Sequence, residues 1–173
     1  KFGGTSVGSV DSIRQIQHII GQQTDDCIVV VSALGGITDQ LLKAAHLALE
    51  AGEEYMEVYQ AIRCRHMDMV NTLITNPTTR QMLCLELEGI LDELRSILFG
   101  VHLVKDLSNK TEAAIVSYGE RMSSRIVTAA LPGAVRKNSL QFIRTEHKQG
   151  QVLLNTELTE QLIRHAFSPM PHL

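Results

Sequence analysis

Three short segments of the chain combine glycines with charged or hydroxyl side chains, and the first is Lys1–Ser6. A lysine ammonium group provides a point charge for phosphate. Gly3 and Gly4 let backbone N–H groups come close to an anion, and Thr5 and Ser6 add two hydroxyl groups. The lysine precedes the glycines, so the segment is neither a P-loop nor a G-x-G-x-x-G loop. It is a phosphate-binding loop or a plain tight turn, and the residues alone leave both interpretations open.

The second segment, Ser32–Asp39, follows a short apolar run and contains Gly35 and Gly36. In open α/β sheets, ligands bind at the carboxyl ends of strands. We therefore expect Ser32 and Thr38 to hydrogen-bond a small polar ligand. The alternative is that Thr38 only caps the helix that follows.

The third segment, Ser117–Ser124, lies inside a helical pattern and contains Gly119. A glycine inside a helix costs about 1 kcal/mol relative to alanine, which indicates a break or a close approach at this point. The carboxylate of Glu120 then either pairs with a substrate ammonium group or stabilises the first turn of a new helix through the helix dipole.

The elements around the first two segments follow the rhythm of an α/β fold. A helix is predicted to start at Asp11 or Ser12 and to end at Gly21. The run Cys27–Ala33 is rich in β-branched residues and predicts a strand buried on both faces of a parallel sheet. The apolar face of the helix is predicted at Ile13, Ile16, Ile19 and Ile20.

From Thr38 to Leu131 the apolar spacing is almost purely helical. It predicts four helices, and their ends are expected at Gly52, Asn76-Pro77, Gly100 and Pro132-Gly133. The remaining chain predicts a strand at 140–144, a turn at Gly150 and a helix from Thr156. No composition shift marks a linker between domains.

Composition narrows the class of protein. The chain has 173 residues, a formal net charge of −3 and 44% hydrophobic residues, as expected for one globular domain. Neither nucleic acid nor a membrane surface is indicated as a partner, and no apolar run approaches the roughly 18 residues that span a bilayer. The odd, scattered cysteines Cys27, Cys64 and Cys84 favour reduced thiols in a cytoplasmic protein, and no His or Cys spacing suggests a metal site.

Together, the three segments resemble aspartate kinases of the amino acid kinase family. Residues 1–7 are similar to the N-terminal signature of that family. Residues 31–39 resemble its second loop, although Asp39 stands where the family usually has asparagine. Residues 118–124 resemble its Gly-Glu-x-x-Ser motif. The order of the motifs matches, as does the long helical stretch between the second and third.

The resemblance implies a three-layer α/β/α sandwich with a large helical insert. Residues 1–173 would form the N-terminal, acceptor-binding part of the kinase domain, incomplete on its C-terminal side. The chain begins on its first motif without an initiator methionine and ends in a loop-like stretch, so we interpret both ends as cuts in a longer gene product. That product would be monofunctional or fused to a homoserine dehydrogenase.

The implied reaction is ATP-dependent phosphorylation of the side-chain carboxylate of L-aspartate to 4-phospho-L-aspartate, the first step toward lysine, threonine and methionine. In the family pattern, Lys1 is catalytic because it neutralises charge on the transferring phosphoryl group, and residues 3–6 complete the phosphate site. Ser32 and Thr38 line the acceptor site, and Glu120 binds the aspartate. The nucleotide mainly holds the Mg²⁺. An ionised carboxylate is already a nucleophile, so no general base is required.

Two alternatives remain. One is a kinase of the same fold that acts on another acid or on a nucleotide, and the other is a non-catalytic helical or regulatory module. We also expect the fragment alone to lack turnover. A truncated sheet leaves an exposed edge and apolar surface, so we expect a homo-oligomer.

Overall fold

The computed structural model describes residues 1–50, 52–148 and 150–168, without the side chain of His147. Residues 1–21 and 29–134 form one compact unit. Residues 22–28 and the described residues after 134 form a second unit. The helices of the first unit are α1 (Val10–Gly21), α2 (Ile37–Leu47), α3 (Glu54–Leu73), α4 (Pro77–Val104) and α5 (Asn109–Ala130).

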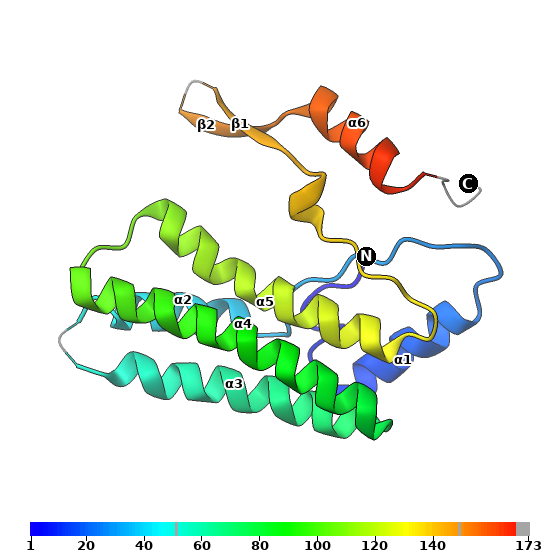
Figure 1. Ribbon diagram of the computed structural model, residues 1–173, viewed down its shortest axis with the longest axis horizontal. Coiled ribbons are helices and arrows are strands. Elements are labelled where there is room, and N and C mark those ends of the chain that lie inside the picture. Colours follow the sequence, from blue (N-terminus) through cyan, green and yellow to red (C-terminus); the bar gives the residue numbers. More distant parts are fainter. Residues whose placement is uncertain (51, 149, 169–173) are drawn as a thin grey trace. The chain divides into compact units, whose positions relative to one another are not determined.

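Four of these helices form a bundle in which α2, α3, α4 and α5 each pack against the next, and α5 returns to α2 (Figure 1). Short connections join them, such as residues 74–76 between α3 and α4, so successive helices run in opposite directions. The first helix, α1, packs against α3 and α5. The predicted helical region is thus confirmed as an antiparallel bundle.

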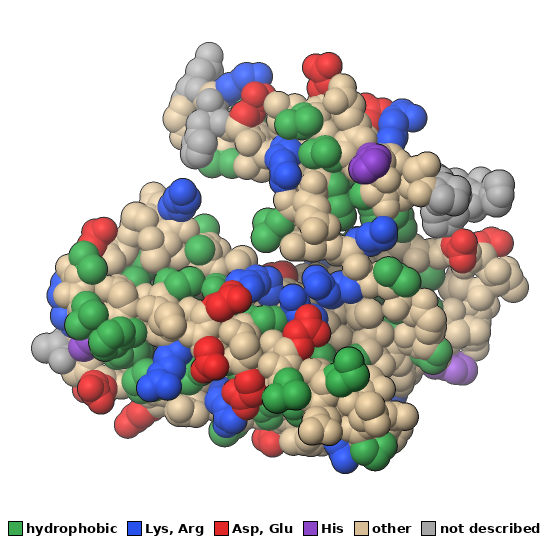
Figure 2. Space-filling view, in the orientation of Figure 1, with side chains coloured by type: hydrophobic (Ala, Val, Ile, Leu, Met, Phe, Trp, Pro, Cys, Tyr) green, Lys and Arg blue, Asp and Glu red, His purple; other side chains and the backbone are tan. Residues whose placement is uncertain are grey.

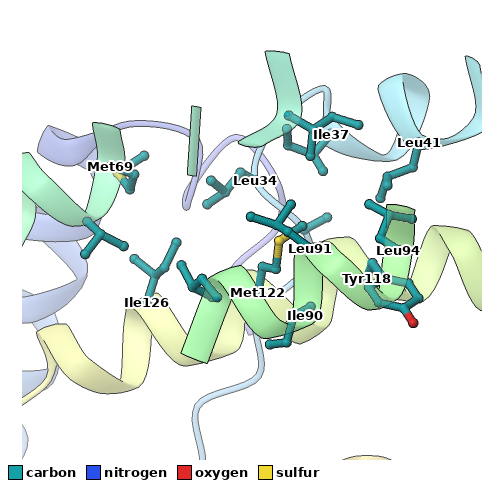
Figure 3. Packing of buried hydrophobic residues seen from close by; sticks show 14 of the residues in the cluster. Leu34, Ile37, Leu41, Met69, Ile90, Leu91, Leu94, Tyr118, Met122 and Ile126 are labelled. Carbon is teal, nitrogen blue, oxygen red and sulfur yellow. The ribbon is translucent and has the colours of Figure 1, made fainter. Parts of the chain in front are cut away.

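The core of the bundle is apolar and draws on every helix. Figure 3 shows Leu34 and Ile37 meeting side chains of α4 and α5, with the hydroxyl of Tyr118 at the margin of the cluster. Leu91, Leu94 and their apolar neighbours have no exposed surface or almost none. Because a side chain of this size gains about 1.5–3 kcal/mol on burial, this cluster supplies most of the stability of the bundle.

Two glycines that were predicted to interrupt helices do not. Gly100 lies within α4, which continues to Val104, and Gly119 lies within a continuous α5. The predicted end at Gly100 and the predicted break at Gly119 are therefore wrong. Burial of Leu98 and Val101 on either side of Gly100 outweighs the cost of about 1 kcal/mol for a helical glycine.

Side-chain caps set several helix starts. The hydroxyl of Ser9 accepts a hydrogen bond from the N–H of Ser12 at 3.1 Å, so α1 begins before the predicted start at Asp11 or Ser12. Asn76 and Ser108 cap α4 and α5 in the same way. Each such cap contributes about 1 kcal/mol to helix stability.

The second helix ends earlier than its apolar pattern predicts, at Leu47 instead of near Gly52. Lys105, just after α4, donates from its amine to the C=O of Ala48 at 3.4 Å and to that of Glu50. Ala48 and Glu50 follow the last residue of α2, so Lys105 satisfies carbonyl groups that would otherwise accept from a further helical turn.

The predicted strand at 27–33 is reduced to one parallel bridge between Phe2 and Val31. Ile28 and Val30 are 59% and 52% exposed, so the prediction of a strand buried on both faces is wrong. Among the described residues the backbone of this segment pairs only with Phe2, and no packed element covers the side chains of Ile28 and Val30. Burial begins at Ala33, which is 3% exposed.

The second unit contains a 3₁₀ turn, a hairpin and a helix. These are η1 (Ser139–Gln141), β1 (Thr145–Lys148), β2 (Gln151–Leu154) and α6 (Thr156–Ala166). The predicted strand at 140–144 is wrong, because the side chain of Asn138 accepts from the N–H of Leu140 and starts a 3₁₀ turn there. The turn at Gly150, with φ 76°, and the helix from Thr156 are confirmed.

Ion pairs join α4 to α5 on the surface of the bundle. Figure 2 shows acidic and basic side chains interleaved on this face. Arg121 binds Glu93 at 2.6 Å, and Arg125 binds Glu86 at 2.5 Å. In both pairs the arginine is half-buried and the glutamate is exposed, so solvent still screens the pair and its main effect is to favour this pairing of helices.

The described residues are mostly helical, with one two-stranded antiparallel sheet. The three-layer sandwich, and the reading of the helices as an insert within it, stay predictions. No helix among the described residues is long and apolar enough to cross a membrane.

Candidate active site

The first glycine loop is anchored at both ends. The N–H of Phe2 donates to the C=O of Val30 at 2.8 Å, and the N–H of Ser32 donates to the C=O of Phe2 at 3.2 Å. At the other end, the N–H of Val7 donates to the C=O of Gly3 at 3.2 Å. The loop between these bonds is therefore held in one shape next to the segment that carries Ser32.

The backbone of this loop presents donors that nothing else in the described chain uses. Among the described residues, the N–H groups of Gly3, Gly4, Thr5 and Ser6 have no hydrogen-bond partner. Lys1 is exposed at the start of the loop. Successive unpaired N–H groups beside a cation form a concentration of positive potential that suits a phosphate group.

Glycines let the two loops pack backbone against backbone. A Cβ on Gly4 would lie 3.2 Å from the C=O oxygen of Ala33, and a Cβ on Gly35 would lie 3.1 Å from the oxygen of Gly4. A Cβ on Gly8 would lie 3.0 Å from that same oxygen. Gly8, four residues after Gly4, belongs to the same glycine-rich loop, but sequence reasoning gave it no role in the site.

The first loop also borders a hollow beside α1. Thr5 and Ser6 line this hollow of about 270 Å³, together with Phe2 and residues of α1. Both residues are exposed. Their hydroxyl groups are thus accessible to a ligand that lies over the loop.

Glu120 lies on α5, and one of its carboxylate oxygens accepts a hydrogen bond from the N–H of Ala33 at 3.2 Å. Among the described residues, Glu120 forms no ion pair. Its neighbour Arg121 binds Glu93 and lies 4.2 Å from the ring centroid of Tyr118. The charge of Arg121 is thus directed to α4, and that of Glu120 to the second loop.

The Arg121 guanidinium lowers the pKa of the Glu93 carboxyl by hydrogen bonding to it. Burial raises the pKa of the Tyr118 hydroxyl, which donates to the same carboxylate at 3.3 Å. Arg121 is the sequence neighbour of Glu120, and its ion pair with Glu93 holds the guanidinium charge against α4.

Ser123 lies at the candidate site, and sequence reasoning gave it no role there. Its hydroxyl donates to the C=O of Ser32 at 2.6 Å, and its side chain is fully buried. Gly119 completes this contact, because a Cβ there would lie 2.6 Å from the Cβ of Ala33. The predicted close approach at Gly119 is thus confirmed. The signal for Ser123 was its place in the segment that resembles a Gly-Glu-x-x-Ser motif, three residues after Glu120 and so on the same helix face.

Thr38 lies in the first turn of α2 and is half-buried. The residue before this helix is Gly36, at φ 80°, and no side chain caps the first turn. The helix-capping interpretation of Thr38 is therefore wrong. The neighbouring Asp39 is exposed. The structure thus brings Ser32 and Glu120 together with the first loop, and places Thr38 at the end of the second.

Metal ligands are not grouped in the part of the chain that the structure describes. No three His, Cys, Asp or Glu side chains come together there to hold an ion. Cys27, Cys64 and Cys84 are all free.

Comparison with known proteins assigns this arrangement to a family. The family model described as "Amino acid kinase family" matches residues 1–170. The chain belongs to the amino acid kinase family. Both glycine loops and Glu120 lie within the matched residues.

Similar proteins include aspartokinases from plants and yeast. Aspartokinase 2, chloroplastic, from Arabidopsis thaliana is 32% identical over 135 residues, which are 76% of this chain and 24% of that protein. The aspartokinase of Saccharomyces cerevisiae is 29% identical over 140 residues, which are 75% of this chain and 26% of that protein. The matched part thus spans about a quarter of the length of these relatives.

Solved structures of Escherichia coli aspartokinase III have the same fold. The complex with aspartate and ADP (R-state) superposes with a TM-score of 0.82 at 24% identity, covering 97% of this chain and 37% of that one. The complex with lysine and aspartate (T-state) gives a TM-score of 0.81 at 25% identity, with the same coverage. The described residues therefore have the fold of an amino acid kinase.

Proposed function

We propose that the protein containing this chain is an aspartate kinase that transfers the γ-phosphoryl group of ATP to the side-chain carboxylate of L-aspartate. The observation that carries the proposal is the loop at 3–6, whose unpartnered N–H groups lie beside Ser32 and the loop that Glu120 contacts. Phosphate donors and an acceptor site are thus adjacent. Aspartokinase relatives, and a structural neighbour bound to aspartate and ADP, support this choice of substrate.

Each residue has a separate role in this proposal. Lys1 and the N–H groups of residues 3–6 bind the transferring phosphoryl group and stabilise the charge on its oxygens. The hydroxyl groups of Ser32 and Thr38 orient the acceptor. The carboxylate of Glu120 pairs with the α-ammonium group of aspartate, which fits an anionic group without an ion-pair partner in the described residues.

The chemistry needs no proton transfer. A carboxylate oxygen of aspartate attacks the γ-phosphorus, the bond from phosphorus to the ADP oxygen breaks, and ADP leaves with the bonding electron pair. Bound ATP supplies the phosphoryl group, and its Mg²⁺ neutralises phosphate charge. The described residues group no acidic ligands for that ion, so we propose that the nucleotide holds it. The residues of this chain hold the aspartate carboxylate and the γ-phosphoryl group in the orientation that the transfer needs.

The test is an acyl-phosphate trap on the full-length gene product. MgATP and hydroxylamine are combined with aspartate, glutamate or N-acetylglutamate, and the hydroxamate is quantified. We expect hydroxamate with aspartate alone. If hydroxamate forms only with another acid, the proposal that aspartate is the acceptor is wrong. If no acid gives hydroxamate, the result favours a non-catalytic helical or regulatory module.

We further propose that residues 1–173 are the N-terminal, acceptor-binding part of the kinase domain and have no turnover alone. The three-layer sandwich, the first step toward lysine, threonine and methionine, and a cytoplasmic location belong to the same proposal. Turnover by the 173-residue chain near the rate of the full-length protein would refute this division of the domain.

A homo-oligomer remains part of the proposal. Several large apolar side chains of α4 are exposed, including Leu85 at 68% and Leu103 at 64%. Exposed apolar surface favours self-association. Light scattering that gives a monomer mass at high concentration would contradict the oligomer.

A further inference from the structure

One peptide unit of the second loop is bound at both ends by side chains of α5. The C=O of Ser32 and the N–H of Ala33 belong to the same peptide group. The hydroxyl of Ser123 donates to that C=O at 2.6 Å, and the carboxylate of Glu120 accepts from that N–H at 3.2 Å. In a trans peptide these two groups point in opposite directions, so the two bonds together fix the rotation of the peptide plane.

The hydroxyl of Ser123 is directed away from its own helix. Serine hydroxyls inside a helix commonly bond to a carbonyl of the preceding turn. Ser117 and Ser124 do this, bonding to the C=O of Ala114 at 2.7 Å and of Arg121 at 3.2 Å. For Ser123, the corresponding carbonyl lies at 3.4 Å and the loop carbonyl at 2.6 Å.

Burial makes this bond costly to lose. Ser123 has no exposed surface, and Ala33 is 3% exposed. Water cannot readily replace the hydroxyl there, so its removal leaves the Ser32 carbonyl without a donor in a dry environment. The peptide then gains freedom to rotate, and its rotation would also weaken the bond from Ala33 to Glu120.

We propose that Ser123 is a positioning residue for the acceptor site, acting through the 32–33 peptide on both Ser32 and Glu120. The inference rests on the proposed function, in which these two residues bind the acceptor acid. The N–H of Ser32 is held by Phe2 and its C=O by Ser123, so the direction of its side chain is set from both sides. Ser123 itself does not contact the substrate.

The experiment compares Ser123→Ala with Ser124→Ala in the full-length protein. Both variants remove one hydroxyl from the same helix, but only Ser123 bonds to the loop. One hydrogen bond corresponds to about a fivefold change in affinity. We expect the KM for aspartate to rise at least about fivefold in Ser123→Ala, with the KM for MgATP within about twofold. Ser124→Ala should match wild type, and Ser123→Thr, which keeps the hydroxyl, should restore the KM.

A purely structural role would lower the melting temperature and the active fraction without moving the KM for aspartate, and that result would overturn the inference. Equal KM changes in Ser123→Ala and Ser124→Ala would overturn it as well.

Amide hydrogen exchange gives a readout that does not depend on turnover. We expect the Ala33 amide to exchange at least about fivefold faster in Ser123→Ala than in Ser124→Ala. Wild type that makes no hydroxamate with any acid would refute the proposed function and, with it, the acceptor-site role. Active wild type with unchanged KM and exchange in Ser123→Ala would refute the inference alone.

Discussion

Gly119 determines how closely α5 approaches the second loop. A Cβ at this position would lie 2.6 Å from the Cβ of Ala33 and 3.3 Å from Leu41, so Gly119→Ala must displace the loop or the helix. We expect a loss of about 1–3 kcal/mol in the free energy of unfolding, typical of an overpacked core.

The matched control is Gly89→Ala, since a Cβ on Gly89 of α4 meets no atom within 4 Å. This change should stabilise the protein by about 0.5–1 kcal/mol, because alanine favours a helix. Urea denaturation measures both variants. Equal effects of the same sign would contradict the close approach at Gly119.

His66 makes stability depend on pH. It is fully buried in α3, its Nδ1 lies 2.7 Å from the C=O of Ile62, and Nε2 has no partner among the described residues. Burial lowers the pKa of His66 from 6.5 to about 4, against the opposing effect of the bond to Ile62. The unfolded chain therefore binds a proton at a higher pH than the folded protein does. The part of the free energy of unfolding that is linked to His66 is therefore fully present above about pH 6.5, and it is lost as the pH falls toward 4.

We expect wild type to lose about 2 kcal/mol more than His66→Leu between pH 7 and pH 5 in urea denaturation. Asn71→Leu, a change at an exposed residue of α3 that does not titrate, should keep the wild-type dependence. Parallel pH profiles for wild type and His66→Leu would show that burial does not hold this imidazole neutral.

Residue types indicated candidate site residues only where they are unusual in their surroundings. Lys1 with the adjacent glycines, and Glu120 after a helical glycine, could be singled out because their pattern is rare in ordinary loops and helices. Ser123 is the serine of the segment that resembles a Gly-Glu-x-x-Ser motif, but its role could not be predicted, because its partner is a backbone carbonyl 91 residues away. Gly8 was given no role, because only the packed loops show that a Cβ at this position has no room.

At the scale of elements, the start of α4 depends on a side-chain cap. Asn76 accepts a hydrogen bond from the N–H of Thr79 at 3.0 Å, and Pro77 occupies the first turn. We expect Asn76→Ala to lower the free energy of unfolding by about 1 kcal/mol. Asn71→Ala, at an exposed position of α3, should change it by less than about 0.5 kcal/mol. No difference between the two in thermal denaturation would contradict the capping role.

The helices were predictable and the strands were not, for a physical reason. An amphipathic helix satisfies its own backbone, so the spacing of its apolar residues is enough to locate α3, α4 and α5. A strand needs a partner, and the sequence around 27–33 does not reveal how much of it pairs. The 3₁₀ turn at 139–141 arises from one side-chain bond of Asn138, which no apolar pattern records.

At the scale of the whole molecule, the division into two units was not predicted, because Pro132-Gly133, just before residue 135, mark an ordinary helix end equally well. The units differ in burial: among the described residues of the second, only Thr159 is buried. Segments with few buried contacts open at low free energy.

We therefore expect amides of β1, β2 and α6 to exchange at least about tenfold faster than those in the middle of α4. Hydrogen exchange with mass spectrometry of the 173-residue chain measures this. Equal protection in both units would show that they unfold as one.

The most direct test of the account asks whether phosphoryl transfer depends on the first loop. Hydroxamate formation from aspartate and MgATP is measured for the full-length protein, for Lys1→Ala and for Lys110→Ala, which removes an exposed lysine at the start of α5. We predict that Lys1→Ala lowers kcat by at least about 100-fold, as expected when a group that stabilises transition-state charge is removed. Lys110→Ala should retain wild-type activity. Wild-type kcat in Lys1→Ala would contradict the phosphate-binding role of this loop, and with it the mechanism proposed for this chain.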